Sequence, residues 1–312
     1  MKNLYKSMNI FKCVHEAHKG FESRMSVHHI LNEKGCFPHG CFYFRWHCKL
    51  MKQGKKCYRG YNFIGRNCHG CRYFYEEKVH NRAELQIGES EFSEFRRELE
   101  EFEDWLGENL NRETEIYGEI DAVKPLFRKR VFPKAESVSF SGFLLIFKQL
   151  YFGRMLMEDH VYIRISSKTF ASFKFGRGDA LTARATLNLD KGRLVLNRLH
   201  RVEIEKRGEA PLWDESKALV ARETAHPIPL QPEGCVQCPY GSLIDVEDLS
   251  RKEPRKYREL YCLKGMKDHR SCHDYVQYCG FDEEANDGVS NAASCMSRKI
   301  NVALRLKTGG LP

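Results

Sequence analysis

The sequence predicts an α+β protein that is mainly β, with a small β-barrel, one long amphipathic helix and two Cys-rich metal-binding modules. Three observations predict this class. The cysteines fall into two groups, with none between Cys71 and Cys235. Strand-like alternation dominates residues 115–208, and one long pattern of helical period precedes it. The two Cys groups therefore flank a β domain.

The boundaries between segments follow shifts in composition. The 312 residues are 42% hydrophobic and 30% charged, which is the balance of a globular protein and excludes a largely disordered chain. The predicted segments are an N-terminal Cys-rich metal-binding module (1–87), an acidic amphipathic linker helix (88–114), the β-barrel (115–208), a Pro-rich linker (209–233), a C-terminal Cys-rich metal-binding module (234–280) and a loose tail (281–312).

The N-terminal cysteines have the spacing of metal ligands. Thirteen cysteines cannot all pair in intramolecular disulfides, and in a reducing compartment such patterns are more often metal sites. Cys68 and Cys71 are two residues apart, a spacing that aims two thiolates at one ion. A four-coordinate site needs two more ligands, and we expect Cys57 with either Cys48 or Cys41.

Residues 88–112 predict one amphipathic helix. Aromatic and aliphatic residues recur there at steps of three and four, with charges between them. Ser90 is the expected N-cap, and Gly107 is expected to weaken or end the helix. The residues expected to be buried are Phe95, Leu99 and Phe102.

From Glu115 the apolar period becomes that of strands. The runs IYGEIDAV, SVSFSGFLLIF, HVYIRIS and ALTARATLNL alternate or are rich in β-branched and aromatic residues. We expect five or six short strands and no strong helix. Asp190-Lys191-Gly192 separates two alternating runs as a hairpin turn, and a break in the second run near Arg198 suits a bulge.

The end of this segment, GDALTARATLNLDKGRLVLNRLHRVEI, resembles the closing hairpin of OB-fold domains. The resemblance covers roughly residues 136–207. It implies a small barrel that binds single-stranded nucleic acid through basic and stacking aromatic residues, although such barrels also serve as plain scaffolds. The residues expected to bind nucleic acid are Lys148, Arg154, Arg164, Lys168, Phe173, Lys174 and Arg177.

The distribution of charge also favours a polyanionic partner. The net charge is +9, but residues 1–80 carry +10, residues 81–122 carry −10 and residues 123–208 carry +11. Two basic blocks separated by an acidic one indicate two modules that share such a partner. The expected partner is single-stranded DNA or RNA, and an acidic protein is the alternative.

The C-terminal segment begins after a Pro-rich stretch. Pro227, Pro229 and Pro232 disfavour regular structure, and SRKEPRKYRELYCL is expected to contain a short helix. Cys235 and Cys238 repeat the two-residue spacing. The expected metal ligands are Cys235, Cys238, Cys262 and either Cys272 or Cys279, with His269 and His273 as possible substitutes.

Zinc at two sites is the favoured cofactor, and a 4Fe–4S cluster is the alternative. The short, regular cysteine run of ferredoxins is absent from the sequence, and basic, aromatic surroundings suit zinc modules that contact nucleic acid. A thioredoxin-like redox pair is disfavoured, because neither pair follows a strand in a βαβ context.

No motif identifies an enzyme. The sequence has no phosphate-binding glycine loop, nucleophile elbow or zinc-protease helix, and it points to no small-molecule substrate. The apolar run FLLIF is too short to span a bilayer and no secretory signal is visible, so we expect a cytoplasmic protein. The leading hypothesis is a nucleic-acid-binding protein, and the rival is an iron–sulfur protein of electron transfer or cofactor assembly that docks an acidic partner.

Overall fold

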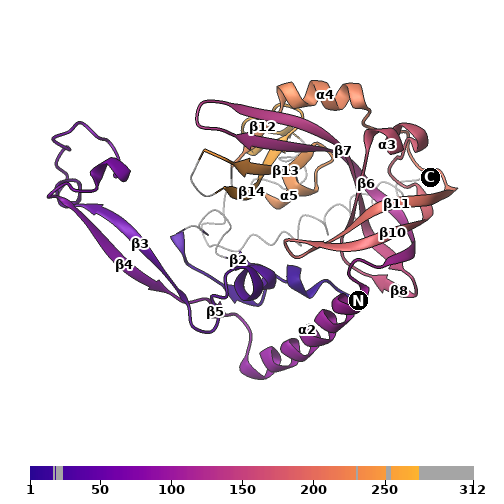
Figure 1. Cartoon of the computed structure of the whole chain (residues 1–312), viewed down its shortest axis with the longest axis horizontal. Coiled ribbons are helices and arrows are strands. Elements are labelled where there is room, and N and C mark those ends of the chain that lie inside the picture. Colours follow the sequence, from indigo (N-terminus) through magenta and orange to yellow (C-terminus); the bar gives the residue numbers. More distant parts are fainter. Residues whose placement is uncertain (17, 19–23, 230, 251–253, 274–312) are drawn as a thin grey trace, which may run out of the picture. The chain divides into compact units, whose positions relative to one another are not determined.

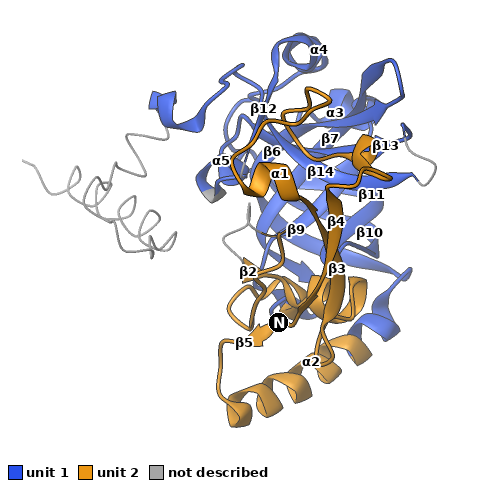
Figure 2. Ribbon diagram, turned by 90° about the vertical axis from the view of Figure 1, so that its left-hand side faces the viewer, with its two compact units in different colours: residues 1–3, 105–312 blue, residues 4–104 orange. Residues whose placement is uncertain are grey.

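The computed structural model describes residues 1–16, 18, 24–229, 231–250 and 254–273 (Figure 1). The chain divides into two compact units (Figure 2). Unit 1 comprises Met1–Asn3 and Trp105–Pro312, and unit 2 comprises Leu4–Asp104. The predicted tail, residues 281–312, and Cys279 lie outside the described residues.

Unit 2 contains a small sheet, a long hairpin and most of a long helix. The sheet has the strand order β2-β1-β5, and the hairpin pairs β3 with β4 and projects from the rest of the unit (Figure 1). The elements are η1 (Leu4–Lys6), β1 (Phe11–Lys12), β2 (Arg24–Met25), η3 (His29–Glu33), β3 (Cys41–Cys48), α1 (Lys49–Lys52), η4 (Arg66–Cys68), β4 (Phe74–Asn81), β5 (Glu84–Leu85) and α2 (Glu89–Asn109).

Helix α2 buries the stripe that the sequence predicts. Phe95, Leu99 and Phe102 are 8%, 6% and 2% exposed, so their predicted burial is confirmed. The helix begins at Glu89, so Ser90 lies inside its first turn and the predicted N-cap is wrong. Gly107 also lies within the helix, which continues to Asn109.

Unit 1 contains a nine-stranded sheet, and the described part of the chain is a strand-rich mixture of helix and strand. Its elements are β6 (Glu113–Val131), β7 (Glu136–Phe152), β8 (Met155–Met157), β9 (Val161–Ile165), α3 (Ser167–Phe173), β10 (Ala180–Asp190), β11 (Arg193–Lys206), α4 (Glu215–Thr224), β12 (His226–Ile228), α5 (Glu233–Gln237), β13 (Gly241–Asp248), β14 (Arg255–Cys262) and η5 (His269–Ser271).

Five strands of this sheet pair in a closed ring. Strand β6 pairs with β7, β7 with β9, β10 with β11 and β10 with β6, all antiparallel, and β9 pairs with β11 in parallel. The remaining part of β6 pairs in parallel with β13, which continues the sheet through β14 to β12. Strand β6 therefore belongs to both the ring and this extension.

The interior of the ring is filled by alternating side chains. Phe143, Leu145 and Phe147 of β7 are fully buried, as is Ile163 of β9. A Cβ atom added at Gly118 of β6 would lie 3.0 Å from the Phe147 ring, so this glycine makes room for the phenylalanine. The hydrophobic effect of these side chains favours the closed arrangement.

The predicted hairpin is confirmed. Asp190 pairs with Arg193, and the two residues between them, Lys191 and Gly192, have φ values of 51° and 77°, as in a type I′ turn. The β10–β11 register shifts opposite Arg198, whose φ is 57°. This confirms the bulge that the break in alternation predicts.

Three sequence predictions about regular structure are wrong. The strands at residues 115–152 are not short, because β6 and β7 span 19 and 17 residues, and β6 runs through both the ring and its extension. The predicted linker contains α4, whose N-cap Asp214 accepts a hydrogen bond from the Lys217 amide at 2.7 Å. The predicted helix before Cys262 is strand β14. The barrel segment contains the short helix α3, of seven residues, which agrees with the expectation of no strong helix.

A glycine-rich turn lies between α3 and β10. It comprises Phe175-Gly176-Arg177-Gly178-Asp179.

Among the described residues, no helix is long and apolar enough to cross a membrane.

Candidate functional site

The tip of the β3–β4 hairpin carries the first candidate site. Cys48, the last residue of β3, pairs with Phe74, the first residue of β4. Residues 49–73 form the tip between them. Cys48 therefore lies at the base of the tip, and three further cysteines, Cys57, Cys68 and Cys71, lie within it.

The Cys68–Cys71 segment is a tight turn. Its second residue, His69, has φ −57° and ψ 136°, its third, Gly70, has φ 78°, and the Cys71 amide donates to the Cys68 carbonyl at 3.0 Å. These values are those of a type II turn, whose third position requires a positive φ and favours glycine. The glycine therefore shapes a turn that brings two thiols to one side.

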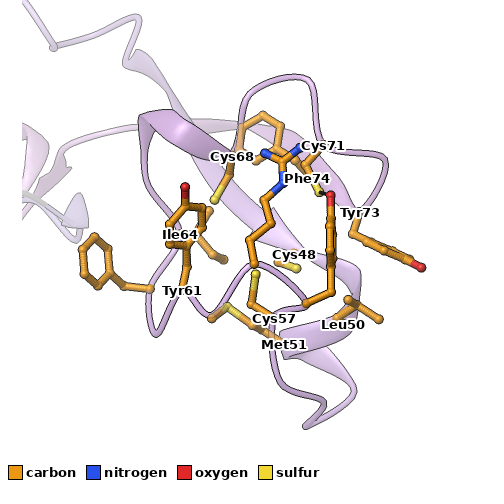
Figure 3. Close-up of a pocket in the computed structure, with 13 residues that line it drawn as sticks. Cys48, Leu50, Met51, Cys57, Tyr61, Ile64, Cys68, Cys71, Tyr73 and Phe74 are labelled. Carbon is orange, nitrogen blue, oxygen red and sulfur yellow. Dashed lines mark hydrogen bonds between the residues drawn. The ribbon is translucent and has the colours of Figure 1, made fainter.

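Cys57 begins a second turn of similar size. The Gly60 amide donates to the Cys57 carbonyl at 3.0 Å, and Gly60 has φ 75°. Cys48, Cys57, Cys68 and Cys71 line the same pocket, which has an empty volume of about 360 Å³ including open solvent, and their side chains surround one space in Figure 3. Four of the five predicted N-terminal ligands are thus brought together.

Electrostatics at Cys71 favour the thiolate. The pKa of Cys71 is lowered, first by hydrogen bonding from the Tyr73 backbone amide and then by the Tyr58 hydroxyl, which lies 3.6 Å from the sulfur. The positive charge of Arg59 and the Phe74 amide act in the same direction. Because metals bind the thiolate form, these groups favour metal binding.

The four cysteines of this pocket suit a metal by their chemistry, but their side chains are not arranged in the geometry of a metal site. Four thiols are the donor set of structural zinc and of iron–sulfur clusters. Among the described residues, no three His, Cys, Asp or Glu side chains are arranged as ligands of one ion. The described residues also contain no disulfide. Cys48, Cys57, Cys68 and Cys71 are the residues that would hold such a group.

Cys41 belongs to a different cluster. It pairs with Asn81 at the opposite end of β3 from Cys48. Burial and the neighbouring Cys41 raise the pKa of Cys36 to about 11, and the two thiols are hydrogen-bonded. The Asn81 amide donates to the sulfur of buried Cys13 at 3.1 Å. Of the two cysteines between which the sequence leaves the choice, Cys48 lines the pocket and Cys41 does not.

The second Cys group gathers at one end of β13 and β14. Cys235 lies in α5, and Cys238 is the residue that caps this helix. Gly241 pairs with Cys262 across β13 and β14, and a Cβ atom at Gly241 would lie 1.7 Å from the Cys235 carbonyl oxygen. Cys235, Cys238 and Cys262 thus come from neighbouring elements. Cys272 follows η5, and of the two proposed substitutes His269 is half-buried and His273 exposed.

Sequence reasoning missed a lysine beside this group. Lys124 is 5% exposed, and its ammonium donates to the carbonyls of Val236 and Gly241 at 2.7 and 2.8 Å. Burial lowers its pKa to about 8, and the nearby Cys238 acts in the opposite direction. The available signal is a single lysine within the apolar stretch IDAVKPLF.

The residues predicted to bind nucleic acid come from several elements of unit 1. Lys148 pairs with Asp121 at 2.9 Å, and Arg164 pairs with Asp190 and, at 3.8 Å, with Asp245. Arg154 lies in the turn between β7 and β8. The other four lie on α3 or just after it, and all but the half-buried Phe173 are exposed: Lys168, Phe173, Lys174 and Arg177.

Unit 2 also contains a pair of facing histidines. The Nε2 atoms of His18 and His29 lie 3.1 Å apart, and His18 is 9% exposed. The pKa of His18 is lowered to about 4, first by burial and then by His29 and His15, and Lys34 adds to the effect. The pKa of His29 is lowered by burial as well, against the opposite effect of Glu33.

We expect unit 2 to lose stability as the pH falls from about 6.5 to about 4. In this window the unfolded chain binds a proton at His18 that the native state does not, so stability falls by about 1.4 kcal/mol per pH unit for this group. Urea unfolding at three pH values would measure the slope. The variant His18→Gln should reduce it, and an equal slope in both proteins would contradict the assignment.

Comparison with known proteins adds no family to this description. No protein-family model, no curated protein and no solved structure matches the chain. The residues themselves offer two Cys groups whose chemistry suits metal binding, one of them within a strongly basic tip.

Proposed function

We propose that this chain is a metal-containing protein that binds single-stranded DNA or RNA. The observation that carries the proposal is the pocket shared by Cys48, Cys57, Cys68 and Cys71, set in a tip whose residues 49–73 include seven Lys and Arg and no Asp or Glu. A bound ion would order a basic loop that otherwise has little core of its own. Ordered cations and exposed aromatic rings are what single-stranded nucleic acid requires.

We infer that the closed ring of β6, β7, β9, β11 and β10 is a small OB-like barrel. Five strands that close through mixed antiparallel and parallel pairs, with a filled interior, support this inference. The position of α3 between β9 and β10 leaves Lys168, Lys174 and Arg177 exposed beside the ring.

Zinc is the metal we propose for both Cys groups. Cys48, Cys57, Cys68 and Cys71 would hold one ion, and Cys235, Cys238 and Cys262 would hold the second with Cys272. In each case the metal supplies folding energy, and the protein supplies thiolates and the hydrogen bonds that orient them. The same proposal places the chain in the cytoplasm, where thiols stay reduced.

The proposal predicts salt-dependent binding in which α3 takes part. Binding of a labelled oligonucleotide, followed by anisotropy, should weaken by about 0.7 log units per log unit of salt for each phosphate neutralised. Replacing Lys174 and Arg177 with Ala should flatten this slope. Lys134→Ala removes an exposed lysine from the β6–β7 turn and serves as the matched control. If the wild-type protein does not bind at low salt, the nucleic-acid proposal fails.

The rival function is an iron–sulfur protein that docks an acidic partner. The thiol donor set of the Cys48 pocket favours it as much as it favours zinc. Anaerobically purified protein separates the two. A colourless protein that contains zinc supports the first proposal, whereas brown protein with several irons per chain supports the rival.

A further inference from the structure

Strand β3 exposes a row of aromatic rings. Phe42, Phe44 and Trp46 occupy alternate positions and are 61%, 57% and 37% exposed, whereas Tyr43 and Arg45 between them are half-buried. Alternate residues of a strand share one face and are about 7 Å apart. We call this surface the aromatic face; it consists of Phe42, Phe44 and Trp46 with their neighbours on β4, Phe74, Glu76, Lys78 and His80.

Neighbouring side chains hold two of the rings in place. The Lys78 ammonium lies 4.3 Å from the centre of the Phe42 ring, and the His80 ring lies 4.7 Å from it. At the other end, Trp46 contacts the rings of His69 and Phe74, at centroid distances of 5.1 and 6.3 Å. His69 belongs to the Cys68–Cys71 turn, so the aromatic face is continuous with the candidate metal site.

The charge around the aromatic face is strongly positive. The adjoining tip, residues 49–73, carries seven Lys and Arg and no Asp or Glu. The tip adds three further exposed rings, Tyr58, Tyr61 and Phe63, and the last of these is 78% exposed. Glu76, opposite Trp46, contributes one negative charge to the face. A group of exposed aromatic rings within a basic region marks an interaction surface for an anionic partner.

We propose that the aromatic face binds single-stranded nucleic acid, with bases stacked on Phe42, Phe44 and Trp46 and phosphates in contact with the basic tip. This inference rests on the proposed function and adds the aromatic face to the basic tip and α3 as a binding surface. Rings one strand repeat apart on an exposed sheet face suit successive unstacked bases, as in the sheets of RNA-binding modules. An acidic peptide would use the cations and would have no need for a row of exposed ring faces.

Binding by the full-length chain tests the proposal. The variant Phe42→Ala/Phe44→Ala should raise the Kd for labelled oligo(dT) or oligo(U) at least about 30-fold and leave the salt slope nearly unchanged, because it removes stacking and no charge. Phe132→Ala is the matched control, because Phe132 is a 42% exposed ring in unit 1. Both rings of the test variant are exposed, so its melting temperature should stay close to that of the wild type.

Tryptophan fluorescence gives a second measurement. A stacked base quenches an indole, so an unlabelled oligonucleotide should quench the protein and Trp46→Phe should remove most of that quenching. Trp213→Phe should leave it, because Trp213 is 5% exposed.

The outcomes separate this inference from the proposed function. If the wild type binds and the Phe42/Phe44 variant binds equally well, the aromatic face is not the site and the proposed function stands. If the wild type does not bind at low salt, both fail. A loss of affinity that matches the loss in the Phe132 control would also overturn the inference, since it would show no preference for the hairpin.

Discussion

Replacing Cys68 and Cys71 together with Ser is expected to remove about one metal ion per chain and to disorder the hairpin tip. The two thiols belong to one type II turn, so the double variant removes half of the ligand set. The metal supplies much of the free energy that orders such a small loop, of the order of 10 kcal/mol in zinc-finger peptides. Elemental analysis would measure the ion, and hydrogen exchange of residues 49–73 would measure the order.

A matched control lies one residue away. Asn67→Ser changes an exposed residue of the same tip and keeps all four cysteines, so it should retain the metal. Cys41→Ser should also retain it, because Cys41 lies at the other end of β3. Unchanged metal content in the Cys68/Cys71 variant, or an equal loss in the Asn67 variant, would refute the assignment of this pocket.

Metal loss should also reach the aromatic face. His69 lies inside the Cys68–Cys71 turn and packs against Trp46, and Phe74 follows the turn and contacts both rings. A turn without its ion would release these contacts. Under this proposal the metal has a structural role, because it positions the rings that are proposed to bind bases.

The strands of residues 115–207 could be predicted from the sequence, because each depends on local alternation and turn chemistry. The type I′ turn at Lys191-Gly192 is an example. Strand β14 could not be predicted from the sequence, because its segment RKYRELYC is rich in residues that favour helices. Its strand form depends on distant partners: Arg258 pairs with Asp245 of β13 at 2.8 Å and with Asp190 at the end of β10.

The cysteine site was predictable in its members and not in its geometry. Spacing alone marks Cys68 and Cys71 as a pair, and the same spacing marks Cys235 and Cys238. The choice of Cys48 depends on the length of β3, which separates it from Cys41. The aromatic face had a visible signal in CFYFRWHC, where rings alternate with other residues, but an alternating strand ordinarily buries such a face.

Asp179 connects several backbone segments at one end of the ring of strands by hydrogen bonds. These contacts explain the glycines around it. Its carboxylate is 2% exposed and accepts hydrogen bonds from the amides of Gly176 at 2.9 Å and Gly208 at 2.7 Å. Arg207 lies 3.3 Å from the same carboxylate. A Cβ atom at Gly176 would lie 1.9 Å from the Glu209 carbonyl oxygen, so only glycine allows the two segments to approach this closely.

Asp179→Ala is therefore expected to destabilise unit 1 by about 3–5 kcal/mol, because it leaves two amides and a guanidinium without their shared acceptor. Asp179→Asn keeps one acceptor oxygen and should cost less. The control is Glu113→Ala, which removes the half-exposed Arg184 ion pair from the same ring and should cost about 1 kcal/mol or less. Urea unfolding would measure all three, and equal midpoints for Asp179→Ala and Glu113→Ala would show that Asp179 does not stabilise this end of the ring.

The contacts of Asp179 also bear on oligonucleotide binding. Because Arg177 lies between Gly176 and Asp179, loss of these contacts should displace a residue proposed to contact phosphate. Asp179→Asn should therefore weaken oligonucleotide binding, whereas Glu113→Ala should not.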